Sequence, residues 1–172
     1  LYQSIYTTAN LVLALRKALR GKRNKASTKI FMQQCRQNLR AIQNRLKNEV
    51  WQPGKYNTFT IFEPKQRLIT AAPFEDRVAH HAIMNITEPV FEKFLIFDSY
   101  ACRKNKGLHR AIKRAQSYQK KYAYFLKLDI KKYFDTINHQ VLLKLLQRQF
   151  KDSKLMRLFS EIIYSSQTNP GK

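Results

Sequence analysis

Apolar residues recur at every third or fourth position over much of this chain, the spacing that predicts amphipathic α-helices. The segments that show this repeat are 9–20, 31–50, 78–94, 108–122, 141–146 and 155–163. The sequence WQPGKY at 51–56 ends the long second segment, because proline and glycine both interrupt helices. Pro73 suits the first position of the third helix, and Pro89 is expected to kink or end that helix.

Two runs of β-branched and aromatic residues predict a β-hairpin. TFTIF (58–62) and RLITA (67–71) flank the turn-like sequence EPKQ, which contains Pro64. Lys65 and Arg67 are then expected at or near the tip of the hairpin.

A third run, AYFLKLDI at 123–130, alternates in a way that predicts a β-strand. One face would carry Tyr124, Leu126, Leu128 and Ile130, and the other Phe125, Lys127, Asp129 and Lys131. Because a single strand cannot form a sheet, it needs partners, which we expect beyond Lys172 rather than in the hairpin. Together the patterns predict a helix-rich α+β fold.

Composition limits the class of protein. The chain has 172 residues, of which 44% are hydrophobic, so it suits a globular domain and not a disordered basic tail. No apolar run is long enough for a membrane span and no signal peptide is visible. Two cysteines, Cys35 and Cys102, fit a reducing compartment. We therefore expect a cytoplasmic protein with no membrane partner.

The charge distribution indicates a polyanionic partner. The net charge is +22, and residues 1–50 and residues 103–132 each hold eleven Lys or Arg and one acid. Residues 51–102 between them hold five basic and six acidic side chains. Two basic zones around a neutral one favour binding of nucleic acid through its phosphates, although such faces can also be simply solvated.

Asp129 is an unusual residue in this setting, because it follows an apolar run and is flanked by lysines. It would form an ion pair with Lys127 or Lys131, cap the turn that follows it, or bind Mg²⁺. Mg²⁺ takes one or two carboxylates and completes its shell with water and phosphate oxygens. Asp135 precedes the next predicted helix and is expected to be its N-cap, with Thr136 and Asn138 as alternatives.

Three motifs resemble one polymerase family. LDIKKYFDTINH resembles the first catalytic motif of reverse transcriptases of the group II intron type, and similar stretches are FTIFEPKQRLITAAPFEDRVAHHAI and FLIFDSYACRKNKGLHRAI. Order and spacing agree across about residues 56–150. The sequences EPKQRLI, SYACR and KGLH are most similar to those of reverse transcriptases from diversity-generating retroelements. Retron, group II maturase and antiphage enzymes share much of the pattern, and Lys132 stands where many group II enzymes carry glycine.

The resemblance implies an RNA-directed DNA polymerase with the fingers and partial palm of a right-hand fold. It implies a basic helical extension at 1–55, fingers at 56–122 and the start of an antiparallel palm sheet at 123–172. The cofactor would be Mg²⁺, with Mn²⁺ as an alternative. The partners would be an RNA template, a DNA or RNA primer and deoxynucleoside triphosphates. A diversity-generating enzyme would also have a small basic accessory protein.

The resemblance also implies roles for individual residues. Asp129 would be the catalytic metal ligand, with the Ile130 carbonyl as a second ligand. Phe134 would exclude a ribose 2′-hydroxyl, unless it is a core aromatic beside Tyr133. The nucleotide-binding residues would be Lys65, Arg67, Lys131 and Phe134. The residues that contact nucleic acid would be Arg77, Arg103, Lys104, Lys106 and Arg110.

One part of the family pattern is missing. The second palm motif carries a pair of aspartates, and after Asp135 this chain has only Asp152 and Glu161, both in helical surroundings. We therefore expect an incomplete catalytic domain that is inactive alone. The alternative from another class is a non-catalytic RNA-binding module that uses the two basic zones.

Overall fold

The computed structural model describes residues 1–62 and 64–165 of the chain. Its elements are α1 (Tyr2–Ile5), α2 (Thr8–Leu19), α3 (Ala26–Gln33), α4 (Cys35–Lys47), β1 (Asn57–Phe62), β2 (Gln66–Ala71), α5 (Phe74–Glu92), α6 (Leu108–Gln119), α7 (Tyr133–Thr136), α8 (His139–Gln149) and α9 (Ser153–Ser165). We distinguish a helical body (α1–α5, α8 and α9), a hairpin (β1 and β2) and an arm (residues 93–132, which include α6). The expected helix-rich α+β class is confirmed.

The centre of the body is the contact between α2 and α5, the most extensive between any two described elements. Small buried residues on both helices, such as Ala14 and Ala82, allow the two backbones to approach closely. The amide of Asn10 bridges them, because its Nδ2 donates to the carbonyl of Ala82 at 2.9 Å and its Oδ1 accepts from Asn85 at 2.8 Å. Nδ2 also donates to the carbonyl of Ile5 at 2.8 Å, so this buried polar side chain joins α1, α2 and α5.

The second half of the core comes from α8 and α9. Phe150 is 1% exposed and packs edge-to-face on Phe91 of α5 and on Phe159 of α9, with ring centroids 5.1 and 5.4 Å apart. At the other end, the Tyr2 hydroxyl donates to the carbonyl of Leu46 at 2.6 Å. One hydrophobic cluster therefore joins residues from all three segments that the sequence predicted, 1–55, 56–122 and 123–172.

The helix expected at 31–50 is two helices, since α3 and α4 meet at Gln34 with φ −122° and ψ 39°. The break lets Phe31 pack on Phe74 of α5, 5.1 Å between ring centroids, while Leu46 stays buried. The Asn38 side chain donates to the carbonyl of Phe31 at 2.8 Å and satisfies it where the helix is interrupted. Tertiary packing thus overrides a repeat that continues through both helices.

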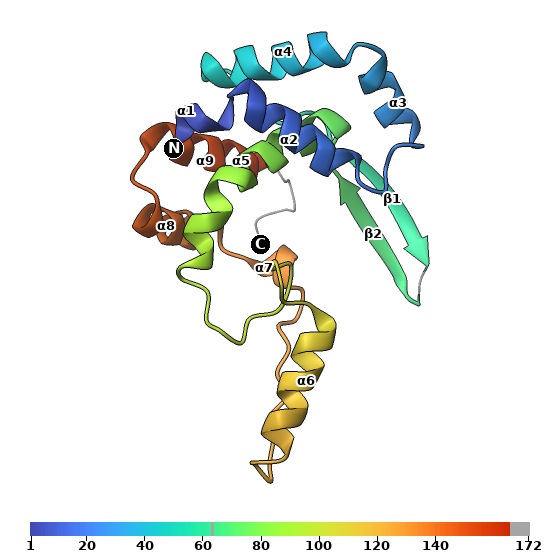
Figure 1. Cartoon of the computed structure of the whole chain (residues 1–172). Helices are drawn as coiled ribbons and strands as arrows, with labels where there is room; N and C mark the ends of the chain where they lie inside the picture. Colours follow the sequence, from blue (N-terminus) through green and yellow to red (C-terminus); the bar gives the residue numbers. More distant parts are fainter. Residues whose placement is uncertain (63, 166–172) are drawn as a thin grey trace.

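The predicted hairpin is confirmed. β1 and β2 are antiparallel, with Asn57 opposite Ala71 and Phe62 opposite Gln66. Figure 1 shows it extending away from the body. Most of its side chains are exposed, so it is held mainly where it joins the body.

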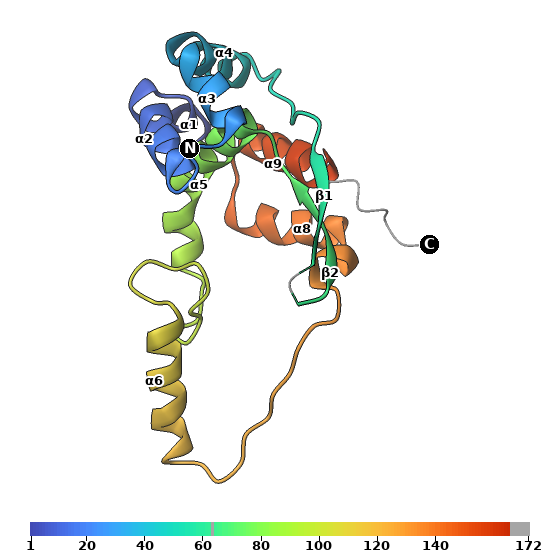
Figure 2. The ribbon, with the colours of Figure 1, turned by 90° about the vertical axis from the view of Figure 1, so that its right-hand side faces the viewer.

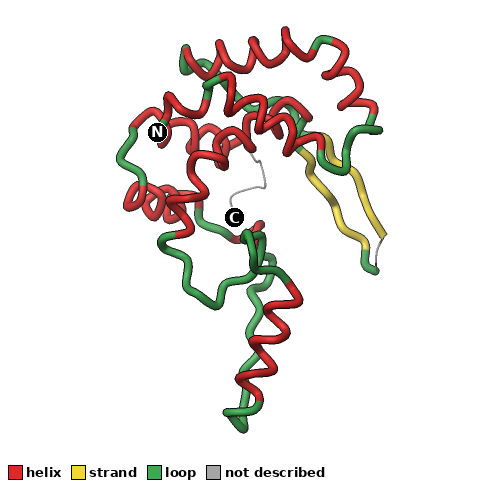
Figure 3. Tube along the Cα trace, viewed as in Figure 1, coloured by secondary structure: helices red, strands yellow, loops and turns green. Residues whose placement is uncertain are grey.

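The strand expected at 123–130 does not form. This segment is extended but has no strand pairing, and Figure 3 draws it as loop. Tyr124 and Phe125 are 93% and 92% exposed. The physical reason is that a strand needs a neighbour for its N–H and C=O groups, and the sheet found in the described residues contains only β1 and β2. The expected start of a palm sheet is therefore not present in this structure.

The rest of the arm is equally open. The structure describes no buried residue on α6, although its apolar face was predicted. In Figure 2 α6 and the extended segment diverge from a turn at the far end of the arm. Within the described ranges, no helix combines the length and hydrophobicity needed to cross a bilayer.

The structure decides between alternatives at two helix ends. Of the two expected effects of Pro89, ending the helix is excluded, because α5 continues to Glu92. The N-cap of α8 is Asn138, whose side chain accepts from the Val141 N–H at 3.0 Å, and not Asp135. Asp135 lies instead inside the short helix α7.

Candidate nucleotide and nucleic-acid site

Asp129 lies in the extended part of the arm, four residues before the start of α7, and is exposed. Among the described residues, no hydrogen bond or ion pair of 4 Å or less to Asp129 is present, so the expected ion pair with Lys127 or Lys131 does not form. The oxygens of this carboxylate are therefore available to a ligand such as a cation.

The residues that follow Asp129 are exposed as well. Ile130 is 65% exposed, Phe134 is 82% exposed and Lys131 faces solvent. Phe134 packs edge-to-face on Tyr133, with 5.3 Å between ring centroids. Tyr133 itself is 49% exposed, so the alternative that Phe134 is a core aromatic does not hold in this structure.

The hairpin carries the other proposed nucleotide contacts. Lys65 lies in the turn between β1 and β2, and Arg67 is the second residue of β2, opposite Ile61. Both side chains are exposed. Among the described residues, no hydrogen bond, ion pair or ring contact joins the hairpin to Asp129 or Phe134, and in Figure 1 the hairpin tip and α7 are apart. The structure does not bring the two predicted groups together.

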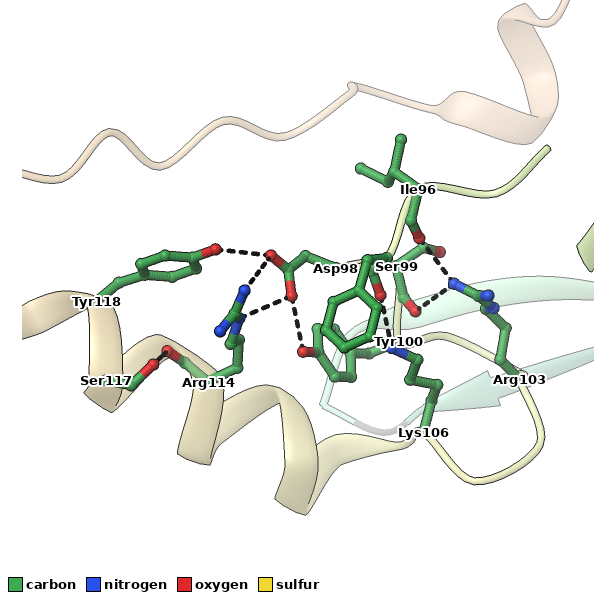
Figure 4. Close-up of polar contacts among 10 residues, drawn as sticks. Ile96, Asp98, Ser99, Tyr100, Arg103, Lys106, Arg114, Ser117 and Tyr118 are labelled. Atoms are coloured by element: carbon green, nitrogen blue, oxygen red, sulfur yellow. Dashed lines mark hydrogen bonds and ion pairs between the residues drawn. The ribbon is translucent and has the colours of Figure 1, made fainter. Parts of the chain in front are cut away.

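A polar cluster centred on Asp98 holds the arm together (Figure 4). The Asp98 carboxylate accepts from Arg114 Nε at 3.0 Å, from the Tyr118 hydroxyl at 2.8 Å and from the Tyr100 hydroxyl at 2.9 Å. The hydrogen bonds from Arg114 and Tyr118 lower the pKa of Asp98 to about 2. The sequence singled out none of these contacts, because they join residues of a loop to a helix that follows it.

Arg103 is used inside the arm. Its guanidinium binds Glu92 through Nε and Nη2, at 2.7 to 3.1 Å, and its Nη1 donates to the carbonyls of Ile96 and Ser99 at 2.8 and 3.0 Å. The side chain is only 10% exposed. The hydrogen bond from Arg103 lowers the pKa of Glu92. This residue thus has an architectural role that the resemblance did not indicate.

The other cations assigned to nucleic acid differ among themselves. Lys106 Nζ donates to the carbonyl of Phe97 at 2.6 Å and lies 3.6 Å from the centroid of the Phe97 ring. Arg110 donates to the carbonyl of Asn105, and Arg77 lies half-buried beside Phe74. Lys104 is exposed.

The donor chemistry at Asp129 suits a hard divalent cation, because Mg²⁺ prefers carboxylate and carbonyl oxygens. The carboxylate is exposed, and the Ile130 carbonyl follows it directly in the chain. Over residues 1–62 and 64–165, no three or more His, Cys, Asp or Glu side chains form a group that could hold a metal. Among the described residues, Asp129 is therefore not part of a cluster of three or more such side chains.

A family model described as reverse transcriptase (RNA-dependent DNA polymerase) matches residues 63–170, more than half of the chain. This chain belongs to the reverse transcriptase family. The matched range includes Lys65, Arg67, the whole arm and the segment with Asp129.

Proteins related to this reverse transcriptase chain include intron proteins. It is 32% identical over 85 residues to the nuclear intron maturase 1, mitochondrial, of Arabidopsis thaliana, covering 49% of this chain and 12% of that protein. It is 27% identical over 127 residues to the putative COX1/OXI3 intron 1 protein of Saccharomyces cerevisiae, covering 70% of this chain and 15% of that protein. Protein YkfC of Escherichia coli is 25% identical over 112 residues, covering 62% of this chain and 29% of that protein. The reverse transcriptase chain thus spans less than a third of the length of each relative.

Proposed function

We propose that the protein carrying this chain is an RNA-directed DNA polymerase that makes cDNA on an RNA template. The observation that carries the proposal is Asp129, an exposed carboxylate with no hydrogen-bond or ion-pair partner among the described residues, in a strongly basic family member. Because Asp129 is exposed, its carboxylate is solvated and needs no partner within the chain, and it stands in LDIKKYFDTINH at the position where the resemblance implies a metal ligand, so its free oxygens support a metal-binding role.

In this proposal Asp129, with the Ile130 carbonyl, holds Mg²⁺ or Mn²⁺. The bound metal would neutralise charge at the reacting phosphate and assist nucleotidyl transfer. Lys65, Arg67 and Lys131 would contact the incoming nucleotide, and the exposed ring of Phe134 would exclude a 2′-hydroxyl. Arg77, Lys104, Lys106 and Arg110 would contact template or primer, and Arg103 would support them through the arm.

Two subtypes fit different observations. The motifs EPKQRLI, SYACR and KGLH favour the reverse transcriptase of a diversity-generating retroelement. Such an enzyme would work in the cytoplasm with a small basic accessory protein. The names of the intron relatives favour a maturase of the group II type. Assaying reverse transcription with and without a co-expressed small basic protein, and splicing of a group II intron RNA, separates the two.

A second candidate function is a non-catalytic RNA-binding module. Exposed cations on α2, α4 and the loop between α2 and α3 favour it; they include Arg16, Arg20, Lys22, Arg23, Arg36 and Arg40. This module would bind RNA with a strong dependence on salt, because phosphate contacts release counterions. Its binding would not depend on Mg²⁺, on nucleotides or on Asp129.

The test is primer extension on an RNA template by the intact protein with Mg²⁺ and deoxynucleotides. Asp129→Asn should reduce extension to background, and Glu88→Gln is the matched control, because Glu88 is a partly exposed carboxylate paired only loosely with Lys17 at 4.0 Å. Full activity of Asp129→Asn would remove the metal assignment.

A second readout does not depend on activity. Fe²⁺ bound in place of Mg²⁺, with added hydrogen peroxide as oxidant and ascorbate to regenerate Fe²⁺, should produce hydroxyl-radical cleavage of the backbone near residue 129. This cleavage should be lost in Asp129→Asn but kept in Glu88→Gln. Salt-dependent RNA binding without such cleavage and without extension would support the RNA-binding module instead.

A further inference from the structure

The orientation of the hairpin is decided where it joins the body. Each strand has six residues, so the tip lies about 20 Å from the base of the hairpin at roughly 3.4 Å per residue. Figure 1 shows the hairpin projecting with no helix along its length. A rotation of about 10° at the base would therefore move Lys65 and Arg67 by about 3 Å.

The segment that leads into β1 is fixed to α5 at two points. Trp51 is 3% exposed, and its ring lies edge-to-face on that of His80, with 6.1 Å between centroids. Three residues later, the Gly54 N–H donates to Asp76 Oδ2 at 2.7 Å. Asp76 and His80 are four residues apart on α5, so they lie on the same face of this helix.

The two ends of the hairpin meet at Asp76. A Cβ atom on Gly54 would lie 3.2 Å from Pro73 Cγ and 3.5 Å from Asp76 Oδ2. Pro73 lies two residues after the end of β2 and is the N-cap of α5. The backbone that enters β1 therefore packs closely against the residue that leaves β2, and only a glycine fits there without a shift.

The position of Asp76 is energetically unfavourable for a carboxylate. It is 4% exposed, and burial of a carboxylate is unfavourable unless it is hydrogen-bonded. Burial raises the pKa of Asp76, while the Gly54 N–H, His80 on α5 and Arg45 on α4 act to lower it. Its neighbour Glu75 is turned to Arg45 instead, with which it forms an ion pair.

We propose that Asp76 is a positioning residue that fixes the orientation of the hairpin through the Gly54 N–H. This part of the inference needs no assumption about activity. Its consequence for nucleotide binding rests on the proposed function, because it requires that Lys65 and Arg67 at the tip contact the incoming triphosphate.

The direct test measures the position of the tip. Spin labels on cysteines placed at Lys65 and at the exposed Asn44 of α4, in a background without Cys35 and Cys102, give the distance distribution by pulsed electron resonance. Asp76→Ala should shift or broaden this distribution. Asp76→Asn keeps an oxygen that accepts from Gly54 and should restore it. Glu75→Ala is the matched control and should leave it unchanged.

The outcomes decide the proposal. An unchanged distribution in folded Asp76→Ala, or equal broadening in Glu75→Ala, overturns it. If Asp76→Ala does not fold, Gly54→Ala decides instead, because it retains Asp76 but forces the segment away from Pro73. A shifted distribution in Gly54→Ala supports the proposal, and an unchanged one overturns it.

Steady-state kinetics of the intact protein then distinguish the orienting role of Asp76 from the proposed nucleotide contacts of Lys65 and Arg67. Asp76→Ala should raise the KM for the incoming nucleotide by roughly tenfold or more, since small misplacements of binding groups are costly, with a smaller effect on kcat. Asp76→Asn should recover most of this loss. A displaced tip with unchanged KM would keep Asp76 as the positioning residue and would remove Lys65 and Arg67 from the proposed nucleotide site.

Discussion

The body and the arm contain the same kind of amphipathic helix, and they differ in what covers its apolar face. α2 and α6 both have twelve residues. α2 buries five of them against its neighbours, whereas Leu108 and Ile112 of α6 are 71% and 46% exposed. An apolar stripe therefore predicts a helix but not the segment that will pack on it, because this depends on which other parts of the chain fold against the stripe.

The two regions also differ in how they hold their acids. In the body, Asp76 is buried and accepts the Gly54 N–H. In the arm, Asp98 is partly exposed, and its carboxylate accepts hydrogen bonds from Arg114 and from two tyrosines. Burial dominates at Asp76 and raises its pKa, while hydrogen bonds dominate at Asp98 and lower its pKa. The body is thus stabilised by packing, and the arm by charged hydrogen bonds near solvent.

The largest expected contrast is in stability. Phe150→Ala should lower the free energy of unfolding by about 3 to 5 kcal/mol, because it removes a ring packed between Phe91 and Phe159. Phe125→Ala in the arm should change it by less than about 0.5 kcal/mol, because Phe125 is 92% exposed. Urea denaturation measures both. A large loss in Phe125→Ala would show that the arm packs on the body in solution.

The pH dependence should have opposite signs in the two regions. The folded pKa of Asp98 is about 2, below its ordinary value of 3.8, so its contribution is present above pH 3.8 and is lost as the pH falls toward 2. The pKa of Asp76 is raised, so its contribution to stability declines as the pH rises from its ordinary value of 3.8 through the raised value.

Amide exchange in the arm and urea midpoints of the whole chain measure these two effects. Asp98→Asn should remove the acid-dependent loosening of residues 96–118, and Asp76→Asn should remove the decline in urea midpoint with rising pH. The same sign of pH dependence in both regions would contradict the contrast between burial and charged hydrogen bonds.

The smallest expected effect separates two adjacent cations of the arm. Arg103→Gln should speed amide exchange over residues 96–106, because it removes the guanidinium that joins Glu92 to the carbonyls of Ile96 and Ser99. Lys104→Gln should leave exchange unchanged but weaken RNA binding at low salt, since its exposed charge is free to meet phosphate. Equal exchange in the two variants would mean that Arg103 is not needed to order the arm.

Local patterns predicted most elements but not their interruptions. The repeat from Phe31 to Val50 is continuous, yet the chain bends at Gln34 because Phe31 is better buried on Phe74. The alternation at 123–130 predicts a strand, yet no described segment pairs with it. In both cases the deciding contact is with a residue far along the chain, which a periodic pattern does not contain.

The candidate site shows the same division. The motif around Asp129 and the hairpin with Lys65 and Arg67 were visible in the sequence, and the family match includes them. The architectural use of Arg103 was not visible, because a single arginine in a polar loop looks the same whether it binds RNA or Glu92. The role of Asp76 was hidden for the same reason, since its partner is the backbone of Gly54, 22 residues away.

Most of the helices, the hairpin, the basic zones and the polymerase motif could be identified from the sequence alone, because periodicity, turn residues and charge are properties of neighbouring positions. Tertiary structure decided which apolar faces are covered, which cations are used internally and what fixes the base of the hairpin. These three features depend on hydrogen bonds and packing between segments far apart in the sequence, and such contacts form only when the chain folds.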